Sequence, residues 1–284
     1  DGNGFVAGIA KNDFYRMIKF HEKKFNSETS TVNQRINGQM RHENDKVIKK
    51  EPVDRFDAVD YDVRISLSKE VTQQSSARHI FDESSIMRVM CYTRLKKRTS
   101  FFVCPELRLD FTEVYSSQGD TLDGPQVTYE VELEVVREIS THTLSQAILR
   151  LLQYWKETHY VIPNSMVASV ERSFCRLVKA KNLSCFAGAQ PRTMQQDDIS
   201  LLEKQPYAIT YKLDGLRSYL YVTNHGMVTL ITGSTIKQIA AIGTDEFDET
   251  VLDGELVNKY HAFDAICWKG RDLRVDEMFR CLRS

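Results

Sequence analysis

The sequence has no long apolar run, no cysteines at metal-ligand spacing and almost no excess of charge. Nothing in its 284 residues approaches the roughly 18 consecutive apolar residues of a membrane span, so we expect no membrane association. The six cysteines include no Cys-x-x-Cys pair, which argues against a structural zinc site and is typical of reduced thiols in an intracellular protein. With 38 basic and 39 acidic residues, any contact with nucleic acid must come from local basic clusters.

The chain is long enough for two modest domains, and 42% of its residues are hydrophobic. Helical spacing of apolar residues predicts a helix over 12–25, capped at Asn12 or Asp13. It predicts two more over 144–155 and 164–178, between stretches rich in strand patterns. We place the domain boundary between these two helices, giving domains 1–160 and 161–284. Residues 26–60 lack clear periodicity and predict loops or short strands.

Apolar and polar residues alternate between residues 61 and 136, most clearly over 62–68, 106–112 and 128–135. Alternation with period two predicts strands that have one apolar and one polar face. Strand-like runs return over 218–222, 227–231 and 251–257. Together with the three helices, these segments predict the α+β class.

Three glutamates occupy alternate positions of one predicted strand: Glu130, Glu132 and Glu134. Residues i, i+2 and i+4 of a strand share a face, so these carboxylates form a row with steps of roughly 7 Å. A hard divalent cation such as Mg²⁺ or Mn²⁺ prefers carboxylate oxygens and relieves their repulsion. The alternative is a solvated sheet face with no ligand at all.

Basic residues follow the same alternation on neighbouring strands. Arg94, Lys96 and Arg98 share one face of an extended segment, and Arg64 and Arg108 occupy the polar faces of their strands. Acids that hold a metal ion and bases that hold phosphate are the two requirements of phosphoryl transfer. We therefore interpret these five residues as candidate phosphate-binding groups.

The glutamate strand, with 93–99 and 107–112 before it, resembles the triphosphate-tunnel metalloenzyme family, in particular the RNA triphosphatase domains of viral capping enzymes. The resemblance implies a closed antiparallel β-tunnel with flanking helices and inward charged faces. Glu130, Glu132 and Glu134 would then line the metal side, with Glu132 essential for catalysis and Asp110 as a further acid. The family also uses a Glu-x-Glu pair on its first strand, which we expect to lie before residue 1.

A second pattern, Lys212-Leu-Asp214-Gly215-Leu-Arg217, precedes a predicted strand. A lysine amine can attack the α-phosphate of a nucleoside triphosphate when its surroundings keep it unprotonated. Gly215 allows a tight turn beside the phosphate, and Arg217 offers a planar set of donors. The alternative is a β-turn at Asp214-Gly215 with incidental charges.

Downstream, Asp253-Gly254-Glu255 and Phe263-Asp264 follow this pattern. The combination resembles the covalent nucleotidyltransferases, which include capping enzymes and ATP-dependent ligases. The resemblance implies that Lys212 carries the nucleotide, that Asp214, Arg217 and Glu255 bind it, and that the sheet is antiparallel. Residues 227–236 match the middle motif of that family poorly, and its last Lys-x-Lys motif is expected after residue 284.

A triphosphate tunnel followed by such a transferase predicts a fused viral-type mRNA-capping enzyme. Its expected substrates are 5′-triphosphate RNA and GTP, with a cap methyltransferase as a domain or partner, in the cytoplasm or nucleus. Two alternatives stay open. One is a polynucleotide ligase that uses the same lysine with ATP, and the other is a non-catalytic module that binds RNA ends.

Overall fold

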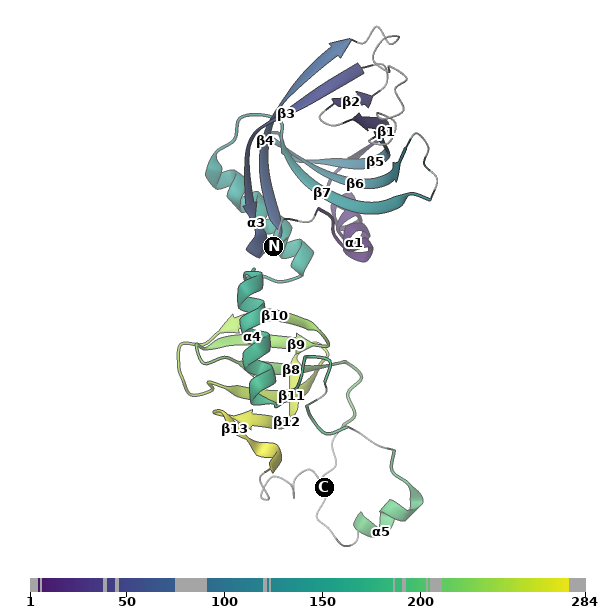
Figure 1. Cartoon of the computed structure of the whole chain (residues 1–284). Helices are drawn as coiled ribbons and strands as arrows, with labels where there is room; N and C mark the ends of the chain where they lie inside the picture. The colour runs from purple at the N-terminus through teal and green to yellow at the C-terminus, as the bar shows by residue number, and fades with distance from the viewer. Residues whose placement is uncertain are drawn as a thin grey trace. The chain divides into compact units, whose positions relative to one another are not determined.

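The computed structural model describes residues 5, 7–37, 40–43, 46–74, 91–119, 122, 124–185, 187–190, 193–202, 204 and 211–275. The chain divides into two compact units, Asp1–Trp155 and Lys156–Ser284 (Figure 1). This division lies a few residues before the boundary predicted from the sequence. No helix in the described ranges has the length and apolar character needed to cross a membrane.

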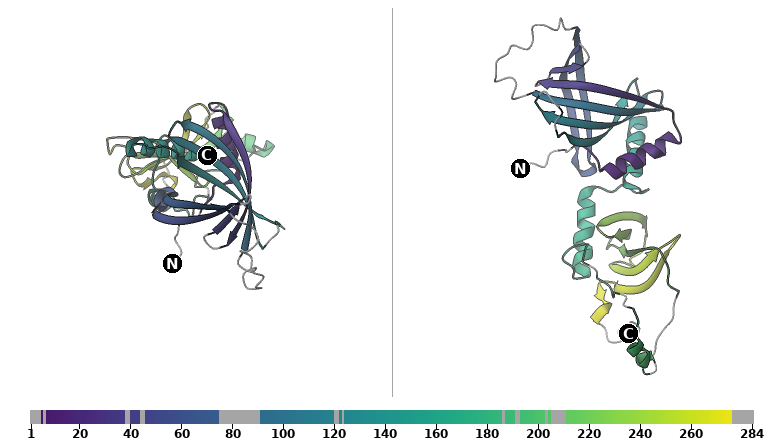
Figure 2. Two further views of the ribbon diagram at one scale, coloured as in Figure 1. Left: turned by 90° about the horizontal axis from the view of Figure 1, so that it is seen from above. Right: turned by 90° about the vertical axis from the view of Figure 1, so that its right-hand side faces the viewer.

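The first unit is built on a seven-stranded antiparallel sheet with the order β4-β3-β2-β1-β5-β6-β7. The strands are β1 (Ser27–Asn37), β2 (Met40–Glu43), β3 (Lys46–Ala58), β4 (Val63–Gln74), β5 (Cys91–Cys104), β6 (Leu107–Gln118) and β7 (Gln126–Val135). The expectation of loops or short strands for 26–60 is wrong, because that range holds the long strands β1 and β3, of 11 and 13 residues, besides the short β2. Both views in Figure 2 show that the sheet curls around an interior.

The edges of this sheet are β4 and β7, and the described residues show no backbone pairing between them. The N-terminal segment contacts both edges. The backbone N–H of Ile9 donates to the Tyr129 carbonyl on β7 over 2.8 Å. The Phe5 ring lies 4.6 Å from the guanidinium carbon of Arg64 on β4. The antiparallel α+β class is confirmed, in the form of a strongly curved sheet.

Helix α1 (Lys11–Glu22) packs on the outer face of the sheet. Its residues Phe14 and Met17 meet Phe101, Leu109 and Phe111 in a buried cluster. Helix α3 (Thr141–Lys156) adds Leu151 and Trp155 to the same cluster. Since alternate residues of β5 and β6 face these helices, the charged residues between them must face the interior.

The predicted cap at Asn12 or Asp13 is wrong. The helix begins at Lys11 after Ala10, without a side-chain cap. The Asp13 carboxylate instead accepts from Arg16 one turn later, over 3.0 Å. An acid in the first helical turn is favourable there through the helix dipole, even when it is not the capping residue.

The second unit holds a six-stranded antiparallel sheet with the order β10-β9-β8-β11-β12-β13. Its elements are α4 (Asn164–Leu177), α5 (Ile199–Leu202), β8 (Leu216–Val222), β9 (Met227–Thr232), β10 (Thr235–Ala241), β11 (Thr250–Leu256), β12 (Tyr260–Trp268) and β13 (Arg271–Asp272). Short 3₁₀ helices lie at Val59–Tyr61 in the first unit, and at Gln196–Asp198 and Leu273–Val275 in the second. Helix α4 covers one face of the sheet through Val170 and Phe174, which pack against Tyr219, Tyr221 and Ile231.

Candidate functional site

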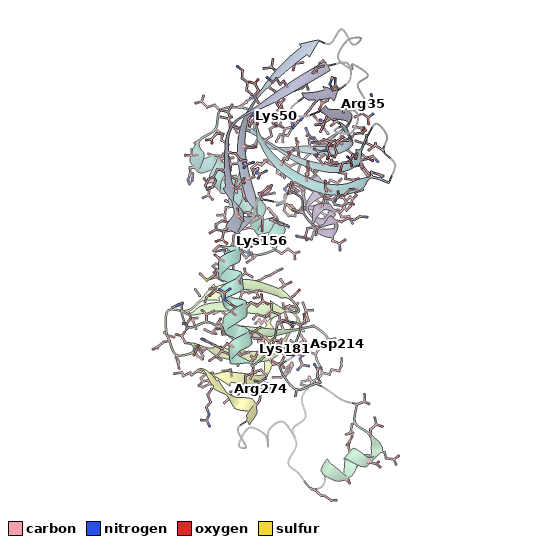
Figure 3. All side chains as sticks on the ribbon, in the orientation of Figure 1. Arg35, Lys50, Lys156, Lys181, Asp214 and Arg274 are labelled. Atoms are coloured by element: carbon pink, nitrogen blue, oxygen red, sulfur yellow. The ribbon has the colours of Figure 1, made fainter. Side chains whose placement is uncertain are left out.

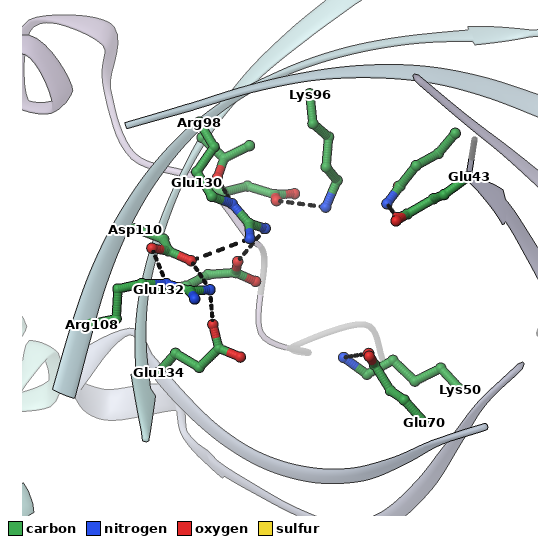
Figure 4. A network of polar contacts seen from close by, with 12 residues as sticks. Glu43, Lys50, Glu70, Lys96, Arg98, Arg108, Asp110, Glu130, Glu132 and Glu134 are labelled. Atoms are coloured by element: carbon green, nitrogen blue, oxygen red, sulfur yellow. Dashed lines mark hydrogen bonds and ion pairs between the residues drawn. The ribbon is translucent and has the colours of Figure 1, made fainter. Parts of the chain in front are cut away.

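The interior of the curved sheet collects charged residues from three consecutive strands. Lys96 and Arg98 come from β5, Arg108 and Asp110 from β6, and the glutamate row from β7. The register places Asp110 opposite Glu132, and Arg108 opposite Glu134. Figure 4 shows these side chains projecting from the strands toward one another. The shared face predicted for the glutamates is therefore present and points inward.

Asp110 lies at the centre of this network and is fully buried. Its carboxylate accepts two hydrogen bonds from Arg108, over 2.9 and 3.0 Å, and lies 3.3 Å from a terminal nitrogen of Arg98. The Nε of Arg98 also donates to Thr112 over 3.3 Å. Both guanidinium groups are thus held in fixed orientations with part of each exposed to the interior.

Each glutamate of the row has a basic partner. Glu130 lies 3.9 Å from the Lys96 ammonium, Glu132 lies 3.7 Å from Arg98, and Glu134 accepts from Arg108. Burial lowers the pKa of Lys96, and the carboxylates of Glu130 and Glu132 oppose that shift. Within the described ranges, no three acidic, histidine or cysteine side chains are grouped closely enough to hold a metal ion.

The other two predicted bases lie apart from this centre. Arg64 on β4 makes a two-bond contact with Asp57 on β3, over 2.6 and 2.9 Å. Arg94 shares its face with Lys96, and its Nε is buried without a hydrogen-bond partner among the described residues. The structure therefore brings Lys96, Arg98 and Arg108 together and leaves Arg64 at the β3–β4 hairpin.

Two interior pairs escaped the sequence analysis. Lys50 on β3 lies 3.6 Å from Glu70 on β4, and the Gln34 amide on β1 donates to Glu43 on β2 (Figure 4). Lys50, Gln34 and Glu43 fall in the range 26–60, where only loops or short strands were predicted. The charged residues of β3 do not alternate, since Lys49, Lys50 and Glu51 are consecutive, so nothing in the sequence indicated an inward face there.

The second cluster lies in the second unit, where the segment before β8 meets β11. Lys212 and Asp214 are largely exposed, and Figure 3 labels Asp214. The Lys212 ammonium donates to the Asp214 carboxylate. This hydrogen bond, together with the charge of Asp214, raises the pKa of Lys212. The amine is therefore protonated in this state.

Gly215 fixes this segment against β11. Its N–H donates to the Glu255 carboxylate over 2.7 Å. A Cβ at this position would lie 2.5 Å from the Leu256 carbonyl oxygen, so only glycine fits without displacement. The close approach of this segment to Leu256 on β11 therefore requires glycine. The sequence had suggested a different reason, a tight turn.

Arg217 is held by a buried acid. Both Asp253 oxygens accept from its guanidinium, over 3.1 and 2.7 Å, and Asp253 is fully buried. The Ala189 carbonyl accepts a further bond over 2.8 Å, and the Phe263 ring lies 5.3 Å from the guanidinium carbon. Lys212, Asp214, Arg217 and Glu255 thus gather at one end of the β8–β11 pair. Sequence reasoning gave Asp253 no such role.

Comparison with protein families gives two matches that together span most of the chain. Residues 8–154 match the family model described as mRNA capping enzyme, beta chain. Residues 158–268 match the model described as mRNA capping enzyme, catalytic domain. The first match covers more than half of the chain, and the two do not overlap.

A curated relative and two solved structures that resemble the chain come from mimivirus. A probable mRNA-capping enzyme of Acanthamoeba polyphaga mimivirus is 25% identical over 194 residues, which are 66% of this chain and 16% of that protein. The chain thus spans a small part of the length of this curated relative. Two solved structures of the mimivirus capping-enzyme triphosphatase are 16% and 17% identical and have TM-scores of 0.44. They cover 53% and 52% of this chain, and 87% and 84% of theirs.

Proposed function

The chain belongs to the mRNA capping enzyme, beta chain family, and from that premise we propose that it carries two successive steps of mRNA capping. The first unit releases the γ-phosphate of 5′-triphosphate RNA. The second takes GMP from GTP onto Lys212 and passes it to the diphosphate end of the RNA. A cap methyltransferase, as a further domain or a partner, would complete the cap.

The network around Asp110 is the observation that carries the first half of this proposal. Arg98 and Arg108 are each fixed by two or more acceptors before any substrate arrives. Donors that are already oriented stabilise the charge that develops on a transferring phosphoryl group, because little reorganisation is needed during the reaction. Lys96, Arg98 and Arg108 are the proposed contacts to the triphosphate, with Arg94 and Arg64 farther along the interior.

The glutamate row fits Mg²⁺ or Mn²⁺ by its donor chemistry. Carboxylate oxygens suit these hard cations, and the row supplies three carboxylate groups on one inward face. Mg²⁺ usually takes one or two protein carboxylates and completes its shell with water and substrate phosphate oxygens. A three-carboxylate cage is therefore not required. When bound, the ion supplies Lewis-acid stabilisation to a phosphoryl oxygen.

Before the metal binds, Arg98 and Arg108 neutralise two of these carboxylates. A polyanionic substrate would compete with Glu132 and Glu134 for the outer nitrogens of these guanidiniums, which Asp110 keeps in place, and so would leave the two carboxylates available to the cation. We propose Glu132 as the residue most needed, because it lies in the middle of the row and opposite Asp110.

The second half of the proposal rests on Lys212 and its neighbours. A covalent step requires the neutral amine, so before attack Lys212 must give up a proton, either to the Asp214 carboxylate that accepts its hydrogen bond or to solvent. The Lys212 nitrogen then forms a bond to the α-phosphorus of GTP, and pyrophosphate leaves. Asp253 fixes the guanidinium of Arg217, which is the proposed contact to the nucleotide. Glu255, which holds the Lys212 segment through Gly215, is the proposed contact to the ribose.

The triphosphatase assay follows release of labelled γ-phosphate from 5′-triphosphate RNA by the full-length protein. Glu132→Ala should abolish metal-dependent release, and Arg98→Ala should slow it about 100-fold if it acts as one strong anion donor. Glu138→Ala, in the loop after β7, is the matched control. Release at the wild-type rate by Glu132→Ala contradicts the assignment.

The transferase assay follows attachment of label from α-labelled GTP to the protein. Lys212→Ala and Lys212→Arg should both abolish labelling, since a guanidinium stays protonated and cannot attack. Lys259→Arg, on an exposed turn of the same unit, should label normally. Stronger labelling by ATP favours the ligase alternative, and binding of triphosphate RNA without either reaction favours the non-catalytic module.

A further inference from the structure

A second polar cluster lines the interior of the first unit where β1, β2 and β5 meet. In the strand register, Gln34 on β1 stands opposite Glu43 on β2 and opposite Arg94 on β5. Directly paired residues of antiparallel strands share a face, and Arg94 is two positions from the inward-facing Lys96. Gln34, Glu43 and Arg94 therefore lie together on the interior face, next to the triphosphate-binding residues proposed above.

Gln34 is only 5% exposed, and its amide orientation is determined by its neighbour. The NH₂ group donates to the Glu43 carboxylate, which can only accept when ionised. The amide oxygen therefore points elsewhere, and it is buried without a hydrogen-bond partner among the described residues. The Arg94 Nε is likewise buried without a hydrogen-bond partner among the described residues. One buried acceptor and one buried donor thus stand unsatisfied on paired residues.

This combination indicates the kind of ligand that fits. Buried polar groups are nearly always hydrogen-bonded, so each unsatisfied atom needs an explanation. Phosphate oxygens can accept from Arg94, but an ionised phosphate has no proton to donate to the Gln34 oxygen, and Glu43 repels it. A hydroxyl group donates and accepts at once, and can satisfy both atoms.

We propose that Gln34, Glu43 and Arg94 form a subsite for the 2′-hydroxyl of the first nucleotide of the RNA. The inference rests on the proposed triphosphatase function of the same interior. Arg94 lies two residues from Lys96 along β5, which is a step of roughly 7 Å. If the triphosphate lies along Lys96 and Arg98, a step of this length places the attached sugar beside Arg94. In an RNA chain the 3′-oxygen of this sugar is esterified, so the 2′-hydroxyl is the free donor that distinguishes RNA from DNA.

The test compares three substrates that share the same phosphates: a 5′-triphosphate RNA, the DNA of the same sequence, and inorganic tripolyphosphate. For the wild-type protein, we expect KM for the RNA to be about tenfold lower than KM for the DNA, the size expected for one hydrogen bond. Gln34→Leu should raise KM for the RNA toward the DNA value, because it removes the acceptor for the 2′-hydroxyl proton and leaves only the contact from Arg94. It should leave kcat, and KM for tripolyphosphate, unchanged.

Glu43→Gln and Gln126→Leu serve as the second variant and the control. Glu43→Gln should weaken the RNA preference, because it replaces an acceptor-only carboxylate by an amide that can also donate, and so no longer fixes the orientation of the Gln34 amide. Gln126→Leu, exposed at the start of β7, should leave the preference intact. Equal KM values for RNA and DNA in the wild type would overturn the proposal. So would a Gln34→Leu variant in which the KM values for all three substrates rise together.

Equilibrium binding of the same three molecules in metal-free buffer separates this inference from the proposed function. If no phosphate is released from any substrate, the triphosphatase assignment fails, and the RNA-to-DNA binding ratio still decides the subsite. A ratio of one, unchanged by Gln34→Leu, assigns the two unsatisfied atoms to bound water and refutes the subsite.

Discussion

Asp110→Ala removes the central acid of the interior network and should destabilise the first unit. Asp110 is fully buried. Its carboxylate accepts two hydrogen bonds from Arg108 and forms an ion pair with Arg98. Removal of one partner from a buried ion pair costs about 3–5 kcal/mol, because the remaining charge is left without compensation. Here the arginine side chains are 26% and 29% exposed, and they keep Glu134 and Glu132 as partners. We therefore expect a loss of about 2–3 kcal/mol in the free energy of unfolding.

Tryptophan fluorescence can assign this loss to the correct unit. The chain has two tryptophans, with Trp155 against the core of the first unit and Trp268 in the second. Urea unfolding in a Trp268→Phe background reports the first unit alone. The midpoint should fall for Asp110→Ala with an unchanged slope, and should stay constant for Glu138→Ala. A change below about 0.5 kcal/mol, the usual size for a surface substitution, would refute the view that Asp110 organises the interior.

Three further predictions test single features. Because burial lowers the pKa of Lys96, its charge is lost at a lower pH than that of an ordinary lysine, so KM for triphosphate RNA should rise early on the alkaline side, and Lys96→Arg should remove that rise. Burial also lowers the pKa of His21, so the neutral form is favoured in the folded state, and stability should be lost as the pH falls below about 6.5 toward the lowered value. His21→Phe should flatten this dependence in urea midpoints measured at pH 5 and 7. Gly215→Ala should reduce labelling of Lys212 by GTP about 100-fold through displacement of its segment, whereas Gly243→Ala, where a Cβ meets nothing within 4 Å, should have no effect.

The strands of the first unit were predictable where apolar and polar residues alternate along the chain. Over β6 and β7 the outer residues pack under α1, so apolar and charged residues alternate and the inward row of glutamates is visible in the sequence. Along β4 the alternation over 62–68 is also visible, although Leu67 is exposed. Its partner β3 shows no such period, and its Val53 and Phe56 are exposed, so no core imposes one. The inward position of Lys50 depends on the β3–β4 hairpin and was missed.

The second unit shows a different limit. The Lys212 segment is local in sequence, and its chemistry could be inferred from residue types and spacing. The partners of Arg217 are distant, since Asp253 follows it by 36 residues and Ala189 precedes it by 28. Which acid pairs with which base depends on the register of β8 with β11, and that register is a property of the folded sheet.

The most direct test of the two-step account follows the phosphates of one RNA through both reactions. The full-length protein is given GTP and a 5′-triphosphate RNA labelled at either the β- or the γ-phosphate. The account predicts that the cap retains the β-label and that all of the γ-label is released as inorganic phosphate before GMP is attached. A cap that contains the γ-label, or a cap formed by the Lys212→Ala variant, would contradict it.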